Sequence, residues 1–129
     1  MPERNLTLED RVNLSRLLMS VLEKWEVDAR QQRSLLGMPD SAKGSDLRKL
    51  QGGKPFPEDE HMLSRAEHLL AIDDCLRTAY PRSSHMASYW LHQASRHFGQ
   101  RTPLRVMLEG GMDGLRRVRG HLDCTQGWV

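Results

Sequence analysis

Residues 90–104 read WLHQASRHFGQRTPL, and they are followed by Gly110-Gly111 and by GLRRVRGHLD at 114–123. Thr102 suits an N-cap and Pro103 suits the first helical position, so a helix is predicted to begin here. The two glycines are expected to end that helix after two turns. Apolar residues then recur at helical spacing, which predicts a last helix that buries Leu115, Val118 and Leu122.

Helical periodicity also runs through the preceding residues, and no segment alternates as a half-buried strand does. Thr7 with Asp10, and Asp28 with Gln31, have the spacing of a capping box, and Gly37 suits a left-handed helix stop. We therefore predict an all-α fold. Its earlier helices are expected over 8–26, 29–36, 42–51, 58–79 and 84–98. The helix over 58–79 is expected to bury Met62, Ala66, Leu69, Ile72, Leu76 and Ala79. The helix over 84–98 is expected to bury Met86, Trp90, Ala94 and Phe98.

The chain has 129 residues, 38% of them hydrophobic, which fits one domain or two small lobes around a modest core. The net charge of +2 conceals two basic segments. Residues 30–54 carry six Lys or Arg against Asp40 and Asp46, and residues 82–129 carry seven Arg against three acidic residues, so each has a local charge of +4. Such segments suit two different acidic or polyanionic surfaces, although solvated helix faces would look the same.

The 29–36 and 42–51 helices, with the turn at 37–41 between them, have the proportions of a helix-turn-helix unit. In such units the second helix enters the DNA major groove, and basic side chains contact phosphates and base edges. The candidate DNA-binding residues are Ser41, Lys43, Ser45, Arg48 and Lys49. The alternative is a helical hairpin that only completes the core. We expect two domains, this N-terminal module over 1–56 and a second helical domain over 57–129.

The sequence holds no arrangement typical of an enzyme. His61 and His68 lie about 10 Å apart along one helix, too far to share a zinc ion, and the six histidines are expected to be solvated. Cys75 and Cys124 stand alone and are expected to be reduced thiols, with Cys75 inert in the core. No run is apolar enough to span a membrane. We therefore expect a cytoplasmic protein with no catalytic residues, metal or cofactor.

The chain resembles the MbcA/ParS/Xre antitoxin family over most of its length. The resemblance is carried by the end of the first helix at Trp25, by Leu35-Leu36-Gly37, by Leu69-Leu70-Ala71-Ile72, by Trp90, Phe98-Gly99, Thr102-Pro103-Leu104 and Gly110-Gly111, and by Gly114-Leu115, Val118-Arg119 and Leu122-Asp123 in that order. It implies an N-terminal Xre-type helix-turn-helix module and a C-terminal toxin-binding domain. It further implies a non-catalytic antitoxin that blocks the NAD site of a RES-domain toxin and also represses its own operon by binding operator DNA.

On that reading, the last helix and the tail are expected to dock at the mouth of the toxin's substrate cleft. Asp123 or the carboxylate of Val129 would pair with cationic groups of the cleft, Trp128 would fill apolar volume, and the arginines would meet an acidic rim. The candidate toxin-binding residues are Arg101, Arg116, Arg117, Arg119, Asp123, Trp128 and Val129.

We expect hetero-oligomers with the toxin as well as homo-oligomers. Two rival functions remain, a stand-alone helix-turn-helix transcriptional regulator and a helical adaptor that dimerises.

Overall fold

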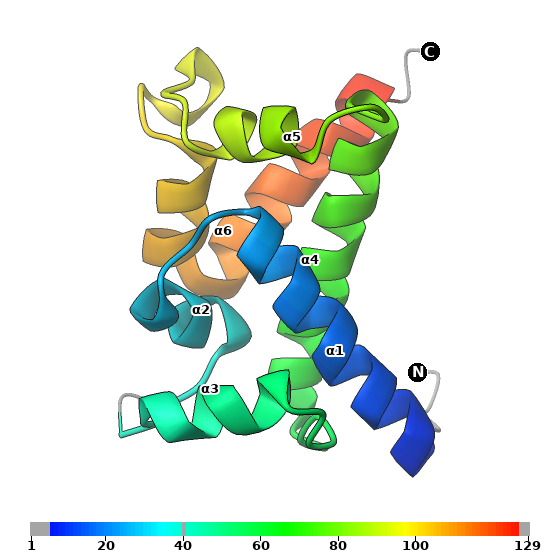
Figure 1. The fold of residues 1–129 in the computed structure, drawn as a ribbon. Helices are drawn as coiled ribbons and strands as arrows, with labels where there is room; N and C mark the ends of the chain where they lie inside the picture. The colour runs from blue at the N-terminus through cyan, green and yellow to red at the C-terminus, as the bar shows by residue number, and fades with distance from the viewer. Residues whose placement is uncertain (1–5, 40, 127–129) are drawn as a thin grey trace.

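The computed structural model describes residues 6–39 and 41–126, and for 124–126 it describes the backbone only. These residues form six α-helices and one short 3₁₀ helix, with no strand among them, so the predicted all-α fold is confirmed (Figure 1). The elements are α1 (Leu8–Lys24), α2 (Ala29–Leu36), α3 (Gly44–Gln51), α4 (Glu60–Ala79), α5 (Ser84–Leu91), η1 (Arg96–Phe98) and α6 (Pro103–Gln126). No helix in the described ranges is long and apolar enough to cross a membrane.

The predicted capping boxes fix the starts of α1 and α2. The Thr7 hydroxyl accepts from the Asp10 N–H at 3.0 Å, and the Asp28 carboxylate accepts from the Gln31 N–H at 2.8 Å. In both boxes the third helical residue also accepts a hydrogen bond from the backbone N–H of the cap. These local bonds satisfy N–H groups that have no partner inside the helix, so short sequence signals are enough to place the helix starts.

The prediction for the third helix is wrong at its start. The helix begins at Gly44, two residues later than expected, and its N-cap is Lys43. The Lys43 N–H donates to Asp46 Oδ2 at 2.9 Å, and this bond lowers the pKa of the Asp46 carboxyl. Gly44 therefore occupies the first helical position, where it weakens the helix less than it would in the interior.

The prediction for the fifth helix is wrong in both its length and its buried face. α5 ends at Leu91 and buries Ala87, Ser88 and Leu91, whereas Met86 is 43% exposed. The cause is a contact with the end of α1: Ser88 Oγ donates to Glu26 Oε2 at 2.7 Å, and His92 Nε2 lies 2.9 Å from the Trp25 carbonyl oxygen. Of the other residues expected to be buried, Ala94 and Ala79 are exposed and Trp90 is half-buried.

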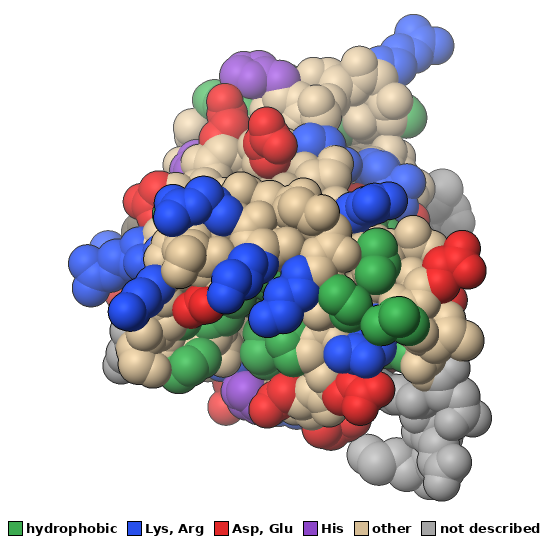
Figure 2. Space-filling view, turned by 60° about the horizontal axis from the view of Figure 1, so that its bottom comes forward, with side chains coloured by type: hydrophobic (Ala, Val, Ile, Leu, Met, Phe, Trp, Pro, Cys, Tyr) green, Lys and Arg blue, Asp and Glu red, His purple; other side chains and the backbone are tan. Residues whose placement is uncertain are grey.

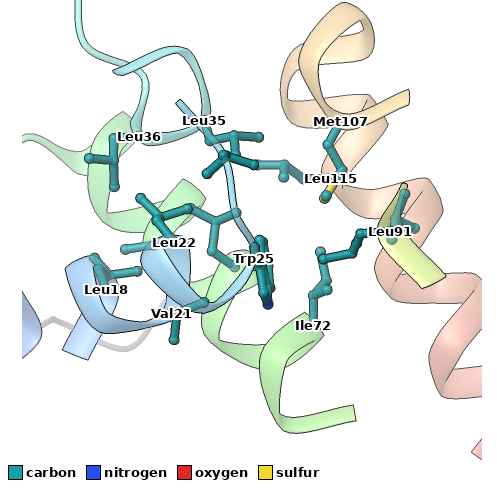
Figure 3. Packing of buried hydrophobic residues seen from close by; sticks show 14 of the residues in the cluster. Leu18, Val21, Leu22, Trp25, Leu35, Leu36, Ile72, Leu91, Met107 and Leu115 are labelled. Atoms are coloured by element: carbon teal, nitrogen blue, oxygen red, sulfur yellow. The ribbon is translucent and has the colours of Figure 1, made fainter. Parts of the chain in front are cut away.

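α4 lies at the centre of the fold, where it packs most extensively against α6 and also contacts α1, α2 and α5. Leucines of α1 and α2, Ile72 of α4, Leu91 of α5 and Met107 and Leu115 of α6 meet around the fully buried Trp25 (Figure 3). One hydrophobic core thus extends across both of the domains expected from the sequence. Their boundary near residue 56 falls in the connector between α3 and α4, and the division into two domains stays a prediction.

The expected break at the double glycine is confirmed. α6 is kinked at Gly111, whose φ of 57° and ψ of −137° are outside the helical region and favour glycine. Gly114 is buried just beyond the kink, where the second half of α6 passes the first at close range. A Cβ atom at Gly114 would overlap the Val106 carbonyl oxygen and lie 3.2 Å from Met107 Cα. The two glycines together let α6 fold back on itself.

Candidate functional site

A cluster of rings lies at the C-terminal end of the chain, where α5, η1 and the second half of α6 meet. His121 of α6 is at its centre. Its ring is stacked on Trp90 with 6.3 Å between centroids, lies 4.4 Å from the His97 ring and meets the Phe98 ring at 5.5 Å in an edge geometry. The Arg117 guanidinium lies 5.9 Å from the centroid of Phe98. We call these five residues the aromatic patch.

The patch is part structural and part accessible. Phe98 is buried, Trp90 and His121 are half-buried, and His97 and Arg117 are exposed. Burial first, and then the neighbouring His97, lower the pKa of His121, which favours the neutral form of the central ring. The expectation that the histidines are solvated is therefore wrong for His121. Aromatic rings and arginines that are fixed in place but still accessible are typical of protein interfaces.

The predicted toxin-binding arginines have different surroundings. Arg117 makes no ion pair with any described residue, and its contact is the Phe98 ring. Arg116 pairs with Asp113 at 3.0 Å on an exposed face. Arg101 instead braces the loop before α6, because its Nε donates to the Phe98 carbonyl at 3.1 Å and its backbone carbonyl accepts from the Ser95 N–H at 3.0 Å.

Arg119 and Asp123 lie together on α6 and contact α4. Their closest atoms are 3.8 Å apart, and Arg119 Nη1 lies 3.1 Å from His68 Nδ1. Asp123 Oδ1 accepts from the Cys75 thiol at 3.3 Å. Burial first, and then this bond to Asp123, raise the pKa of Cys75 to about 11, which keeps the thiol protonated, as expected of an inert core cysteine. The two remaining candidates, Trp128 and Val129, lie outside the described residues, as does the side chain of Cys124.

Two exposed residues of α5 extend the patch and were missed by the sequence analysis. Met86 and Tyr89 are 43% and 52% exposed, and they lie three residues apart, one turn along the helix. Met86 also lies four residues before Trp90, so these two side chains leave α5 on the same side. The sequence predicts a helix that continues to Phe98, and on such a helix Met86 would lie in the core.

The predicted DNA-binding residues are accessible. Ser41, Lys43, Arg48 and Lys49 are exposed, and Ser45 is half-buried. Lys and Arg side chains gather on the face of the molecule that carries α3 (Figure 2). Leu47 and Leu50, which face the other way, are buried against the core. The polar face of α3 is thus accessible for contact with a polyanion.

In the part of the chain that the structure describes, no three His, Cys, Asp or Glu side chains come together in a way that could hold a metal ion. Asp73 is the buried carboxylate, and it is neutralised by Lys24 at 3.2 Å and by Arg77 at 3.1 Å. This arrangement ties α1 to α4.

An all-helical fold with an accessible aromatic and arginine surface is typical of a protein-binding protein. Residues 78–127, which include α5, the aromatic patch and α6, match the family model of the antitoxin Xre/MbcA/ParS C-terminal toxin-binding domain. The C-terminal part of the chain is therefore similar to the toxin-binding domain of these antitoxins, as its sequence indicated.

The matching family model describes the domain with which these antitoxins bind a toxin. The chain is also similar to the uncharacterized protein y4oB of Sinorhizobium fredii (strain NBRC 101917 / NGR234). The two are 27% identical over 107 residues, which cover 83% of this chain and 79% of that protein.

Proposed function

We propose that this protein neutralises a RES-domain toxin by covering the toxin's NAD site with the aromatic patch, the end of α6 and the residues that follow it. The observation that carries the proposal is the coincidence of the patch with the family match, because all five residues of the patch fall within 78–127. The exposed side chains of Met86 and Tyr89 widen the same surface. On this proposal the protein binds its partner and catalyses no reaction itself.

Charge assigns different roles to the parts of this surface. A cleft that binds the pyrophosphate of NAD contains cationic groups, which Asp123 and a carboxylate beyond it would complement. Arg116, Arg117 and Arg119 would face an acidic rim and mainly accelerate association, with Arg101 holding the loop that presents Phe98. Arg117 is the strongest candidate among them, because it is exposed and has no carboxylate partner among the described residues.

The test is co-expression with the RES-domain toxin of the same operon, with cell growth, cellular NAD and co-purification as readouts. Removal of residues 124–129 and the substitution Arg117→Glu should each weaken neutralisation. Arg48→Glu serves as the matched control, since it reverses an exposed charge on α3 instead. Unchanged protection by both the truncated chain and Arg117→Glu would place the toxin contact elsewhere.

The second candidate function is operon repression by DNA binding through α2 and α3. It is favoured by the exposed Lys43, Arg48 and Lys49 on one face of α3. Binding of the promoter should fall steeply with salt, and Arg48→Glu should weaken it without affecting the toxin. Promoter binding together with no effect on any toxin would instead identify a stand-alone regulator. Sedimentation of the free protein and of its complexes tests for homo-oligomers and for the hetero-oligomer with toxin.

A further inference from the structure

A concave site lies where the end of α2 meets α4, outside the residues that match the toxin-binding domain. It is a cleft of about 560 Å³, which is within the range of roughly 300–1,000 Å³ that is typical of small-molecule sites. Its walls include Arg30, Arg33, Ser34, Met38, Pro39 and Arg65. Neither the toxin-binding surface nor the exposed face of α3 accounts for this cleft.

The cleft is strongly cationic. Arg30 and Arg33 lie one turn apart on α2, so their side chains leave the helix on the same side. Arg65 reaches the cleft from α4, and the lining residues that the structure describes include no Asp or Glu. In the described part of the chain, none of the three guanidinium groups is paired with a carboxylate, in contrast to Arg77, Arg105 and Arg116, which all are.

Arg65 is held in place by the residues around it. Its Nε lies 3.1 Å from His61 Nε2, and its Nη1 donates to the Ser34 carbonyl at 3.4 Å. Gly37 leaves the space that Arg65 occupies, because a Cβ at Gly37 would lie 2.5 Å from Arg65 Cδ. A guanidinium has five N–H donors, so Arg65 still has donors to offer.

One further feature favours an anion in this cleft. Burial lowers the pKa of Arg65, and a bound anion would offset the cost of holding this positive charge away from water. The C-terminal end of α2 carries partial negative charge, which by itself opposes an anion. The Ser34 carbonyl at this end, however, already accepts hydrogen bonds from the Gly37 N–H at 3.1 Å and from Arg65. The negative end of α2 is thus partly neutralised on the side of the cleft.

We propose that this cleft binds a small phosphate-bearing anion, with Arg30, Arg33 and Arg65 as its cationic ligands. Guanidinium groups match the oxygens of phosphate in bidentate geometry, and three of them favour a ligand with at least two negative charges over a single carboxylate. Met38 and Pro39 offer apolar contact beside the charges, which suits the nucleoside part of a nucleotide. The concave shape favours such a ligand over a DNA duplex.

The test is isothermal titration calorimetry of the full chain with inorganic pyrophosphate and with ADP at constant ionic strength. The variant Arg30→Gln/Arg33→Gln removes two cationic ligands. It should weaken binding of both probes by about tenfold or more, because hydrogen bonds between guanidinium groups and phosphate are among the strong ones. Arg82→Gln/Arg96→Gln is the matched control, because it removes the same charge from exposed positions away from the cleft. Circular dichroism establishes that both variants fold.

Tighter binding of ADP than of pyrophosphate would identify a nucleotide, and equal binding a phosphate or pyrophosphate group alone; both support the proposal. Equal weakening by the two double variants would show attraction by net charge only and would overturn it. The proposal also fails if neither probe binds. It fails equally if neither probe binds while promoter DNA does bind, with a lower affinity for the Arg30→Gln/Arg33→Gln variant than for the parent protein. None of these outcomes depends on whether the protein neutralises a toxin.

Discussion

Gly114→Ala tests how α6 folds back at its kink. The added methyl group would overlap the Val106 carbonyl oxygen and lie 3.0 Å from the carbonyl carbon, and both atoms belong to the backbone of the same helix. A flexible side chain could move aside, but this backbone can yield only if the two halves of α6 separate. Overpacking of this kind costs about 2–3 kcal/mol. For a chain of this length that free energy corresponds to a fall in Tm of about 10 °C.

Gly120→Ala is the matched control on the same helix. A Cβ at Gly120 meets no atom within 4 Å, so the substitution should only raise helix propensity and stabilise the protein by about 1 kcal/mol. Thermal and urea unfolding of the two variants, followed by circular dichroism, should therefore move in opposite directions from the parent protein. If Gly114→Ala is as stable as Gly120→Ala, the close crossing of the two halves of α6 is wrong.

Three further predictions concern titratable and charged groups. Cys75, with its pKa raised to about 11, should resist alkylation at pH 8 in a Cys124→Ser background until the protein unfolds; rapid modification of the native protein would contradict its burial. The pKa of His121 is lowered in the folded state, so the unfolded state takes up a proton first as the pH falls. The free energy of unfolding should keep its full value above pH 6.5, which is about the pKa of a histidine in the unfolded chain. It should decline as the pH falls from there through the lower pKa of His121 in the folded protein. His121→Gln should flatten this decline of Tm without abolishing it, because burial and then the charges of Arg119 and Arg116 lower the pKa of His68 as well. Asp73→Asn should lower the free energy of unfolding in urea by about 1–2 kcal/mol, which is less than for a fully buried ion pair because Lys24 and Arg77 are partly exposed. Asp74→Asn, at the exposed neighbouring position, should leave this free energy almost unchanged. Equal losses in the two variants would refute the role of Asp73 as the buried partner of both cations.

Sequence reasoning succeeded where the cause of a structure lies within a few residues of it. The starts of α1 and α2 follow from side chains that bond to the backbone three residues away. The start of α6 is of the same kind, because the Thr102 hydroxyl accepts from the Arg105 N–H at 3.0 Å. The resemblance to the antitoxin family was recognisable for a related reason, because short motifs in order along the chain carry it. Those from Trp90 to Leu122-Asp123 lie within the matched residues 78–127.

Sequence reasoning failed where a distant segment decides the local structure. The buried face of α5 is set by Ser88 and His92, which bond to groups at the end of α1 more than sixty residues earlier. An uninterrupted helical stripe through Met86 and Trp90 was a reasonable reading of the local pattern, but this contact rotates and shortens the helix. As a result the exposed Met86 and Tyr89 were missed as candidate binding residues.

The sequence by itself determined that this protein is all-helical, where most of its helices begin, and that its C-terminal part has the pattern of an antitoxin's toxin-binding domain. Capping bonds and helical periodicity act over one or two turns, so they can be recognised in a linear string of residues. Only the tertiary structure brought Trp90, Phe98 and His121 into one patch and gathered Arg30, Arg33 and Arg65 around one cleft. Such groupings depend on how separate helices pack, and packing is decided by the shared core and not by the neighbours of any single residue.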